Sequence, residues 1–287
     1  MARHHQHVTI IGVGLLGGSI GLALKALHGR DVHVAGVGRS LDSLNAAIKA
    51  GAIDSAHLDA AEAAPSTDLV ILATPVCTFE HHLRRLAPVL KKSAWVTDVG
   101  STKLAVVKTA NRLIGQDRFI GSHPMAGSDV RGVANASADL FAAATCIITP
   151  SSKTPPTLRR RASGLWKSLG MKTIEMSPAR HDQVVARISH LPHLLSAALM
   201  LLPKDDDLAA AAGGFKDMTR ISGGDVEMWR DILLTNKQNI LAALDAYEKR
   251  LRETRRIIAA ADVSAIERNL IKAQLRRRLF VNGNLNR

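Results

Sequence analysis

Aromatic residues and cysteines are scarce in this chain of 287 residues: aromatics make up 3% of it, and there are 2 cysteines. The hydrophobic core must therefore be built mainly from Ala, Leu, Ile and Val. Cys77 and Cys146 each stand alone in an apolar stretch and fit no metal-ligand spacing. We expect two buried free thiols in a reducing compartment, and hence a cytoplasmic protein.

Long hydrophobic runs are also missing. No apolar segment reaches the roughly 18 residues of a membrane-spanning helix, so we expect no membrane contact. The opening MARHHQH leads directly into a strand-like segment and has none of the features of a signal peptide. The length suffices for one large domain or two medium domains with well-buried cores.

Positive charge is in excess, with a formal net charge of +13. This balance favours anionic partners, either small carboxylates and phosphates or nucleic acid. The basic runs are residues 158–161, 248–256 and 275–278, and none has interleaved aromatic residues for base stacking. We interpret them as solvated helix faces and expect no nucleic-acid partner.

Strand-like and helix-like segments alternate over the first 176 residues. Short apolar runs predict strands at 7–12, 32–37, 68–73, 94–99, 118–121, 145–150 and 172–176. Helical periodicity separates most of them, at 15–28, 41–50, 78–91, 102–114 and 155–169. This alternation predicts an α/β domain at 1–176 of the Rossmann type, with a doubly wound, mainly parallel sheet.

The strand signal stops after residue 176. Ser177 and Pro178 form a good helix start, and helical sequence then continues almost to the end, with breaks at 203–207, 213–214 and 222–225. We therefore expect an all-helical domain at 177–287 that binds substrate and dimerises. The long helices expected at 236–261 and 263–280 have apolar faces that favour a homodimer.

A glycine-rich turn follows the first strand. Gly12, Gly14 and Gly17 in GVGLLGGS match G-x-G-x-x-G between a strand and a helix, the context that dinucleotide binding requires. The first glycine allows a tight turn, the second allows close approach of a pyrophosphate, and the third allows helix–strand packing. Leu15 and Leu16 begin the helix whose N–H groups would face the phosphates.

The end of the second strand predicts which dinucleotide is bound. NAD sites usually have an acidic residue there for the ribose 2′-hydroxyl. This chain has Gly38, Arg39 and Ser40 instead, and the latter two could bind a 2′-phosphate. NADP is therefore the favoured cofactor, with NAD as the alternative.

Several polar residues follow predicted strands, where ligands bind in doubly wound sheets. Thr74 and Pro75 follow one strand, Asp98 and Ser101 the next, and His123 follows the run RFIG within GSHPMAGSD (121–129). We expect all of them to face the nicotinamide half of the cofactor. The small residues around His123 predict an accessible ring, suited to handling a proton.

The helical half contributes a second set of polar residues. Ser189 and His193 are four residues apart, so they share a helix face, and Pro192 is expected to bend that helix. A helical histidine is more often structural than catalytic, so both interpretations stay open at this point. Arg220 precedes a Gly-Gly turn, and arginine is well suited to binding a carboxylate in a bidentate fork.

These segments together resemble the prephenate/arogenate dehydrogenase family of tyrosine biosynthesis. The resemblance rests on GVGLLGGSIG, DVGSTK (98–103), GSHPMAGSD, ISHLPH (188–193) and FKDMTRISGGDVEMW (215–229), and it covers almost the whole chain. It implies a Rossmann domain followed by a helical dimerisation domain. It also implies that a cyclohexadienol passes hydride from C4 to NAD(P)⁺, loses its ring carboxylate as CO₂ and becomes aromatic.

The resemblance further implies roles for individual residues. His123 would hydrogen-bond the substrate 4-hydroxyl and accept its proton, and Ser101 would orient that ring or contact the same hydroxyl. Arg220 would hold a substrate carboxylate, and no metal is implied. The remaining residues implied to line the pocket are Ser189, His193 and, from either subunit, Trp229.

Two features depart from the family pattern, and other functions remain as alternatives. Gly38 replaces the acid of NAD-using members, and no strand-bearing segment for an ACT domain follows, so tyrosine control through such a domain is not expected. Competing hypotheses are a β-hydroxyacid dehydrogenase, with Lys216 as its catalytic lysine, and a non-catalytic nucleotide-sensing or nucleic-acid-binding module. Prephenate and arogenate are not distinguished.

Overall fold

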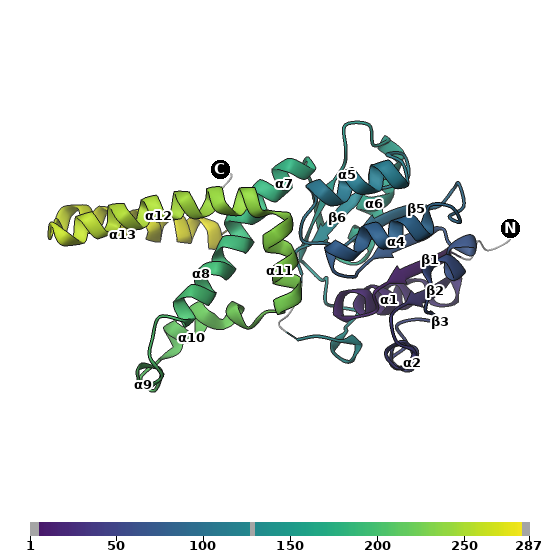
Figure 1. The fold of residues 1–287 in the computed structure, drawn as a ribbon, viewed down its shortest axis with the longest axis horizontal. Coiled ribbons are helices and arrows are strands. Elements are labelled where there is room, and N and C mark those ends of the chain that lie inside the picture. The colour runs from purple at the N-terminus through teal and green to yellow at the C-terminus, as the bar shows by residue number, and fades with distance from the viewer. Residues whose placement is uncertain (1–5, 127–129, 283–287) are drawn as a thin grey trace. The chain divides into compact units, whose positions relative to one another are not determined.

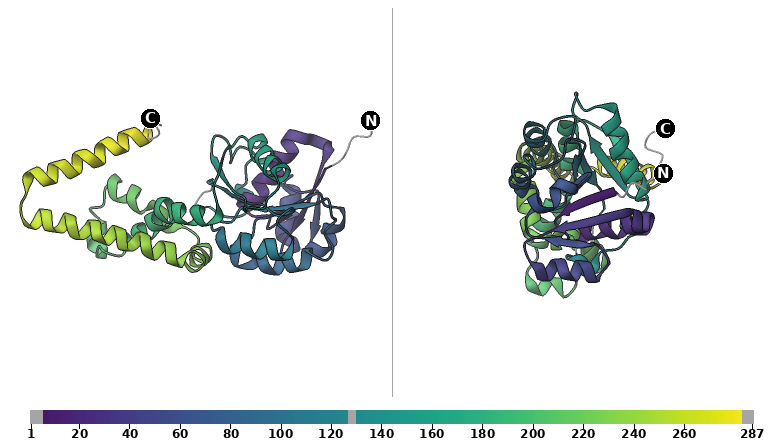
Figure 2. Two further views of the ribbon diagram at one scale, coloured as in Figure 1. Left: turned by 90° about the horizontal axis from the view of Figure 1, so that it is seen from above. Right: turned by 90° about the vertical axis from the view of Figure 1, so that its right-hand side faces the viewer.

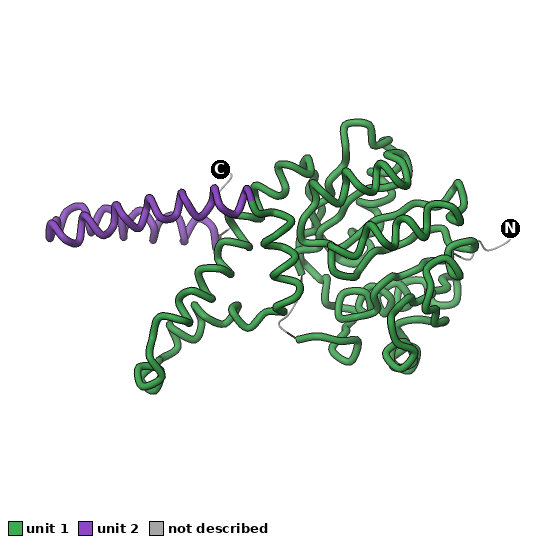
Figure 3. The backbone as a smooth tube through the Cα atoms, viewed as in Figure 1, with its two compact units in different colours: residues 1–237 green, residues 238–287 purple. Residues whose placement is uncertain are grey.

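The computed structural model of the chain describes residues 6–126 and 130–282 (Figure 1). The chain forms two compact units, residues 1–237 and 238–287 (Figure 3). The first unit contains every strand of the described residues. The second consists of most of one long helix and the helix that follows it.

Five parallel strands form the main sheet, in the order β3-β2-β1-β4-β5. Four of them are apolar runs and match the predicted strands closely, whereas β3, with the sequence SAH, lacks such a run and was not predicted. The strands are β1 Gln6–Ile11, β2 Val32–Val37, β3 Ser55–His57, β4 Leu69–Leu72 and β5 Trp95–Asp98.

Helices cover both faces of this sheet (Figure 2), which explains why its strands are apolar on both sides. On one face α1 (Leu15–His28), α2 (Leu41–Lys49) and α6 (Pro156–Ser168) bury their apolar side chains in one core cluster. On the other face α3 (Ala60–Ala63), α4 (Phe79–Leu86) and α5 (Leu104–Leu113) form a second cluster. The doubly wound fold is thereby confirmed.

A second, three-stranded sheet continues from the first. Its strands are β6 (Gly121–Pro124), β7 (Thr145–Thr149) and β8 (Lys172–Glu175), with β6 antiparallel to β7 and β7 parallel to β8. The strand predicted at 118–121 therefore begins later. Residues 118–120 run beside β5 through a parallel bridge between Val96 and Phe119, and the chain then enters β6. This change of sheet determines where His123 lies.

Helices follow β8, as predicted. Ser177 caps α7 by accepting a hydrogen bond from the backbone N–H of Arg180. The elements are α7 Pro178–Val185, a π turn Ala186–His190, α8 Leu191–Met200, α9 Asp205–Leu208, α10 Gly213–Thr219, a 3₁₀ turn Arg220–Gly223 and α11 Val226–Thr235. Because α7 packs against α5, and α11 against residues 76–78, the compact units divide after residue 237; the domain boundary at 176/177 stays a prediction.

The last two helices are α12 (Lys237–Ala259) and α13 (Val263–Val281). None of the residues of α13 is buried, and several of its large apolar side chains are about half exposed or more. These include Leu270, Ile271, Leu275, Leu279 and Phe280. Among the described residues, no helix is both long and apolar enough to cross a membrane.

The two cysteines differ in exposure. Cys146 is buried on β7, as predicted, and burial raises the pKa of its thiol. Cys77 is exposed, because it lies in the short 3₁₀ turn Val76–Thr78 that follows β4. The expectation that both thiols are buried is therefore wrong for Cys77.

Two helical glycines offer a matched test of this packing. A Cβ on Gly21 of α1 would overlap the carbonyl oxygen of Ala52, whereas a Cβ on Gly164 of α6 would meet nothing within 4 Å. We expect Gly21→Ala to lower the free energy of unfolding by about 1–3 kcal/mol. Gly164→Ala should raise it by about 0.5–1 kcal/mol. Urea denaturation measures both; equal effects would contradict the close approach of α1 to Ala52.

Candidate active site

The predicted cofactor residues follow three adjacent strands. The neighbours β2, β1 and β4 run in the same direction, so the segments after them lie at one edge of the sheet. These segments are 38–40, 12–17 and 74–75, the last with Thr74 Oγ1 2.7 Å from Thr78 Oγ1. The structure thus brings these residues together at the edge where doubly wound sheets bind ligands.

The glycine turn has the geometry that a pyrophosphate requires. Gly12 has φ +96°, and a Cβ there would lie 2.7 Å from the backbone of Ala73. A Cβ on Gly17 would overlap the carbonyl of Gly12, so this glycine allows α1 to pack closely. At Gly14, by contrast, the space beside Cα is open. Since the first turn of α1 has no acidic residue, the site fits the phosphates of a dinucleotide.

The end of β2 presents no carboxylate to the ribose. Gly38 donates its N–H to the carbonyl of His57, and Arg39 and Ser40 are exposed. Ser40 precedes α2 in an extended conformation, and its side chain makes no capping hydrogen bond there. A cation and a hydroxyl are therefore exposed directly after β2.

Asp98, at the end of β5, is occupied within the protein. Its carboxylate is fully buried and pairs with the equally buried Lys103. It also accepts the backbone N–H groups of Gly100 at 2.9 Å and Ser122 at 3.1 Å. The sequence had suggested that this side chain faces the cofactor. Its carboxylate is instead directed at partners within the protein. It connects β5 with β6 one residue before His123.

His123 lies within β6 rather than in a loop. It pairs with Ile147 of β7, and only 8% of its surface is exposed. The expectation of an accessible ring after a strand is wrong, because β6 begins at Gly121 and carries this histidine into the second sheet. Residues 127–129 of the GSHPMAGSD segment lie outside the described residues.

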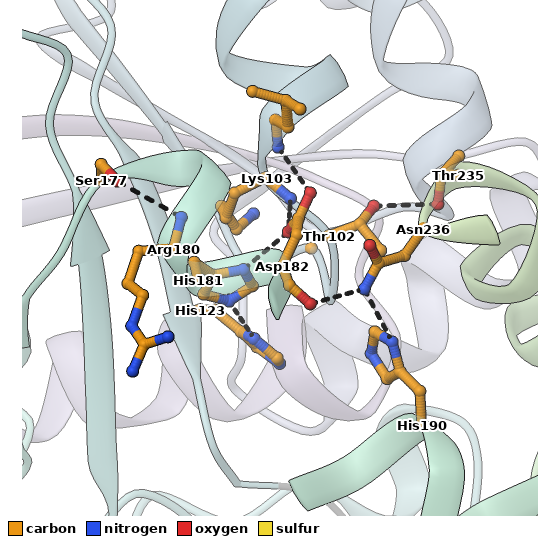
Figure 4. A network of polar contacts seen from close by, with 12 residues as sticks. Thr102, Lys103, His123, Ser177, Arg180, His181, Asp182, His190, Thr235 and Asn236 are labelled. Carbon is orange, nitrogen blue, oxygen red and sulfur yellow. Dashed lines mark hydrogen bonds and ion pairs between the residues drawn. The ribbon is translucent and has the colours of Figure 1, made fainter. Parts of the chain in front are cut away.

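A chain of side chains leads from His123 to a buried carboxylate (Figure 4). His123 Nδ1 lies 2.8 Å from His181 Nε2, and His181 Nδ1 lies 2.8 Å from Asp182 Oδ1. The backbone N–H groups of Lys103 and Leu104, at the start of α5, donate to the two oxygens of Asp182. Both α7 and α5 thus hold this carboxylate in place.

The charge state of Asp182 determines which nitrogen of His181 carries the hydrogen. Burial alone would raise the pKa of Asp182, but hydrogen bonds from His181, Leu104 and Lys103 outweigh it, so the pKa lies below its ordinary value. The ionised carboxylate accepts only, so His181 carries its hydrogen on Nδ1. Burial lowers the pKa of His181, which keeps it neutral and leaves Nε2 as an acceptor.

His123 must therefore donate from Nδ1. Burial, followed by the nearby His181 and Lys103, holds the pKa of His123 well below its usual range. The neutral ring then has its lone pair on Nε2, the nitrogen that can accept a proton. Sequence reasoning missed His181 and Asp182; the adjacent pair HD just after the helix start at Ser177 was the available signal.

Ser101 does not hold the ring of His123. It is partly buried, and within 6–126 and 130–282 no hydrogen bond joins its side chain to that histidine. His181 has the orienting position that was expected for Ser101. Contact of Ser101 with a substrate hydroxyl stays a prediction.

The helical half presents a stacked pair of rings. His193 of α8 lies on Trp229 of α11, with ring centroids 3.5 Å apart and planes within 8°. Gly224 makes room for this stack, since a Cβ there would lie 2.5 Å from the indole nitrogen. Burial lowers the pKa of His193, although the Ile221 carbonyl opposes the shift.

The helix that carries Ser189 and His193 contains a π turn, Ala186–His190, and the bend expected at Pro192 stays a prediction. Pro192 lies in the first turn of α8, directly after the π turn, where a missing N–H is tolerated. Ser189 is partly buried within the π turn. Such turns are rare and occur frequently at functional sites, which supports a functional role for this segment.

Arg220 is exposed at the start of the 3₁₀ turn Arg220–Gly223, which packs against α8. Its guanidinium has no ion-pair partner among the described residues and is available to an anion. The described part of the chain contains no cluster of His, Cys, Asp or Glu suited to a metal ion.

Comparison with known proteins identifies the family of this chain. Residues 20–175 match the family model of the prephenate dehydrogenase nucleotide-binding domain, and 177–272 that of the prephenate dehydrogenase dimerization domain. Prephenate dehydrogenase of Bacillus subtilis is 36% identical over 276 residues, which cover 93% of this chain and 74% of the relative.

Solved structures give the same result. Prephenate dehydrogenase of Aquifex aeolicus, in complex with hydroxyphenyl propionate and NAD⁺, superposes with a TM-score of 0.89 at 32% identity, covering 96% of this chain and 98% of the other. Arogenate dehydrogenase of Synechocystis gives 0.82 at 30% identity, with 96% and 100% covered. These matches favour this family over the β-hydroxyacid dehydrogenases, and the chain belongs to the prephenate dehydrogenase family.

Proposed function

We propose that this enzyme oxidatively decarboxylates prephenate or arogenate with NADP⁺, and that His123 is its proton acceptor. The hydrogen-bond chain Asp182–His181–His123 carries the proposal, because it fixes the lone pair of His123 on Nε2. The nicotinamide, when bound, accepts the hydride from C4. As the hydride leaves, Nε2 takes the proton of the 4-hydroxyl, and Asp182 stabilises the resulting imidazolium through His181.

Loss of the ring carboxylate completes the reaction. Its bonding electrons enter the ring as CO₂ leaves, the ring becomes aromatic, and the C4 oxygen becomes a phenolate. The proton on His123 can return to this oxygen, which restores the neutral imidazole. One acid–base residue therefore serves both halves of the reaction, and no net proton is released.

Substrate and cofactor binding are assigned to the remaining residues. Arg220 would hold a carboxylate in a bidentate fork, and Ser101 would contact the 4-hydroxyl. Ser189, His193 and Trp229 would line the pocket around the substrate side chain. Arg39 and Ser40, exposed after β2, support NADP, although the Aquifex relative was solved with NAD⁺.

The helical part supports a homodimer. Residues 177–272 match a dimerization domain, and α13 exposes Leu270, Leu275 and Leu279 within its own chain. A second copy would remove these apolar side chains from water. The unpaired thiols Cys77 and Cys146 support a place in the reducing cytoplasm.

A four-way assay tests the activity. Purified enzyme is given prephenate or arogenate, each with NAD⁺ or NADP⁺, and nicotinamide reduction is followed by absorbance. We expect turnover of at least one substrate, with kcat/KM higher for NADP⁺, because no carboxylate at the end of β2 repels a 2′-phosphate. Absence of turnover in all four arms would refute the proposed function.

His123→Asn tests the proton acceptor. We expect kcat to fall by about 10²- to 10⁴-fold while NADP⁺ affinity is kept, since the side chain acts on the substrate. In the wild type, kcat/KM should stay level down through the ordinary histidine range and fall only at lower pH, because the pKa of His123 is depressed and its neutral form persists. Normal turnover of the variant would remove His123 from this role.

Arg39→Asp tests the cofactor preference. The new carboxylate would repel a 2′-phosphate and could accept the ribose hydroxyls, so the ratio of kcat/KM for NADP⁺ to that for NAD⁺ should fall by about tenfold or more. Arg30→Asp is the matched control, since it makes the same charge change just before β2, at the opposite end of that strand. If both variants change the ratio equally, or neither does, Arg39 does not read the phosphate.

A further inference from the structure

His190 is a buried histidine that the mechanism above does not use. It is the last residue of the π turn and is only 1% exposed. Asn236 holds its ring from one side: Asn236 Nδ2 lies 3.1 Å from His190 Nδ1 and donates to the carbonyl oxygen of Asp182 at 2.8 Å (Figure 4). The ring is thus tied to the residue that orients His181.

These contacts determine the tautomer of His190. An amide nitrogen can only donate, so Nδ1 of His190 accepts from Asn236. Burial lowers the pKa of His190 to about 4, although Asp182 opposes the shift, so the ring is neutral near pH 7. A neutral imidazole with an accepting Nδ1 carries its hydrogen on Nε2.

The Nε2–H of His190 lacks an acceptor. The atom is buried, and it has no hydrogen-bond partner among the described residues. A buried donor without a partner is unfavourable, and native structures rarely retain one without a reason such as a ligand or a bound water. The tautomer that Asn236 selects thus leaves a buried N–H donor to which a ligand oxygen could bind.

The surroundings of His190 place this donor within the active site. Asn236 links the ring to the backbone of Asp182, whose carboxylate ends the hydrogen-bond chain that begins at His123. The Trp229 ring is perpendicular to the His190 ring, with centroids 6.0 Å apart. His190 is therefore connected to the His123 chain through Asn236 and adjoins Trp229, the ring that stacks on His193.

We propose that His190 donates its Nε2–H to the C4 oxygen of the bound substrate. The inference rests on the proposed function, in which this oxygen gives its proton to His123 and becomes a phenolate as CO₂ leaves. A permanent carboxylate suits an arginine, whereas an oxygen that is charged only during the reaction suits a preorganised neutral donor. The site then pairs one accepting imidazole with one donating imidazole.

Kinetics of three variants test the proposal. His190→Phe keeps a ring but removes the donor, and kcat should fall about 10- to 100-fold with little change in KM, because the bond strengthens as charge develops. His190→Gln can present an amide N–H and should recover part of kcat. Ser196→Ala is the control: its hydroxyl is also buried on this helix without a partner among the described residues, and we expect wild-type kinetics.

Ligand binding to the wild-type holoenzyme gives a readout that a structural role would not move. With ¹⁵N-labelled histidine, the His190 Nε2–H signal is assigned by its loss in His190→Gln. It should shift when hydroxyphenyl propionate is added and not when phenylpropionate, which lacks the C4 oxygen, is added. This measurement decides the matter even if His190→Phe does not fold.

The outcomes separate the two proposals. Wild-type turnover with a kcat loss in His190→Phe and a shift specific to hydroxyphenyl propionate supports the assignment. Unchanged kcat in a folded His190→Phe, an effect on KM alone, or equal shifts with both ligands would overturn it while leaving the proposed function intact. A wild type inactive with all four substrate–cofactor pairs would instead refute the proposed function.

Discussion

The carboxylate of Asp182 is the contact on which the rest of the site depends. It receives two backbone N–H groups at the start of α5, where no acidic side chain of that helix is available, and one from the ring of His181. Unpaired N–H groups and the helix dipole favour an anion at such a terminus. The same carboxylate thus joins α7 to the nucleotide-binding part. It also determines which ring nitrogen carries the hydrogen in His181 and His123.

A buried ion pair, Asp98 with Lys103, adjoins the strand residue that precedes His123. Asp98 and Lys103 are both fully buried, and breaking such a pair by removing one partner typically costs about 3–5 kcal/mol. Their arrangement fixes β6 against β5 through the N–H of Ser122, directly before His123. Lys103 also adds to the effect of burial and His181 on the pKa of His123. This ion pair therefore helps to position His123, and its lysine reinforces the lowering of the His123 pKa that burial causes.

The elements that could be predicted from the sequence are those that depend on local patterns of residues. The glycine turn, four strands of the main sheet and the helix start at Ser177 follow from short runs of residues whose chemistry is sufficient by itself. The partners of His123 depend on contacts between distant segments: His181 is 58 residues away, and Asp182 is 79 residues from Lys103. Asp98 shows the same limit, since its place after a strand suggested a ligand while Lys103 and Ser122 had already occupied it.

Charge is divided between the surface and the interior of the site. The exposed Arg39 and Arg220 remain hydrated, so they can exchange water for anionic groups at little cost. The buried His123, His181 and His190 are instead kept neutral by burial, with Asp182 and Asn236 selecting the nitrogen that carries each hydrogen. This neutrality matters for the proposed reaction, in which His123 gains a proton, because an imidazolium has no free lone pair to accept one. An imidazolium already formed would oppose this proton transfer, whereas two neutral histidines linked to the ionised Asp182 can take up the positive charge as it forms.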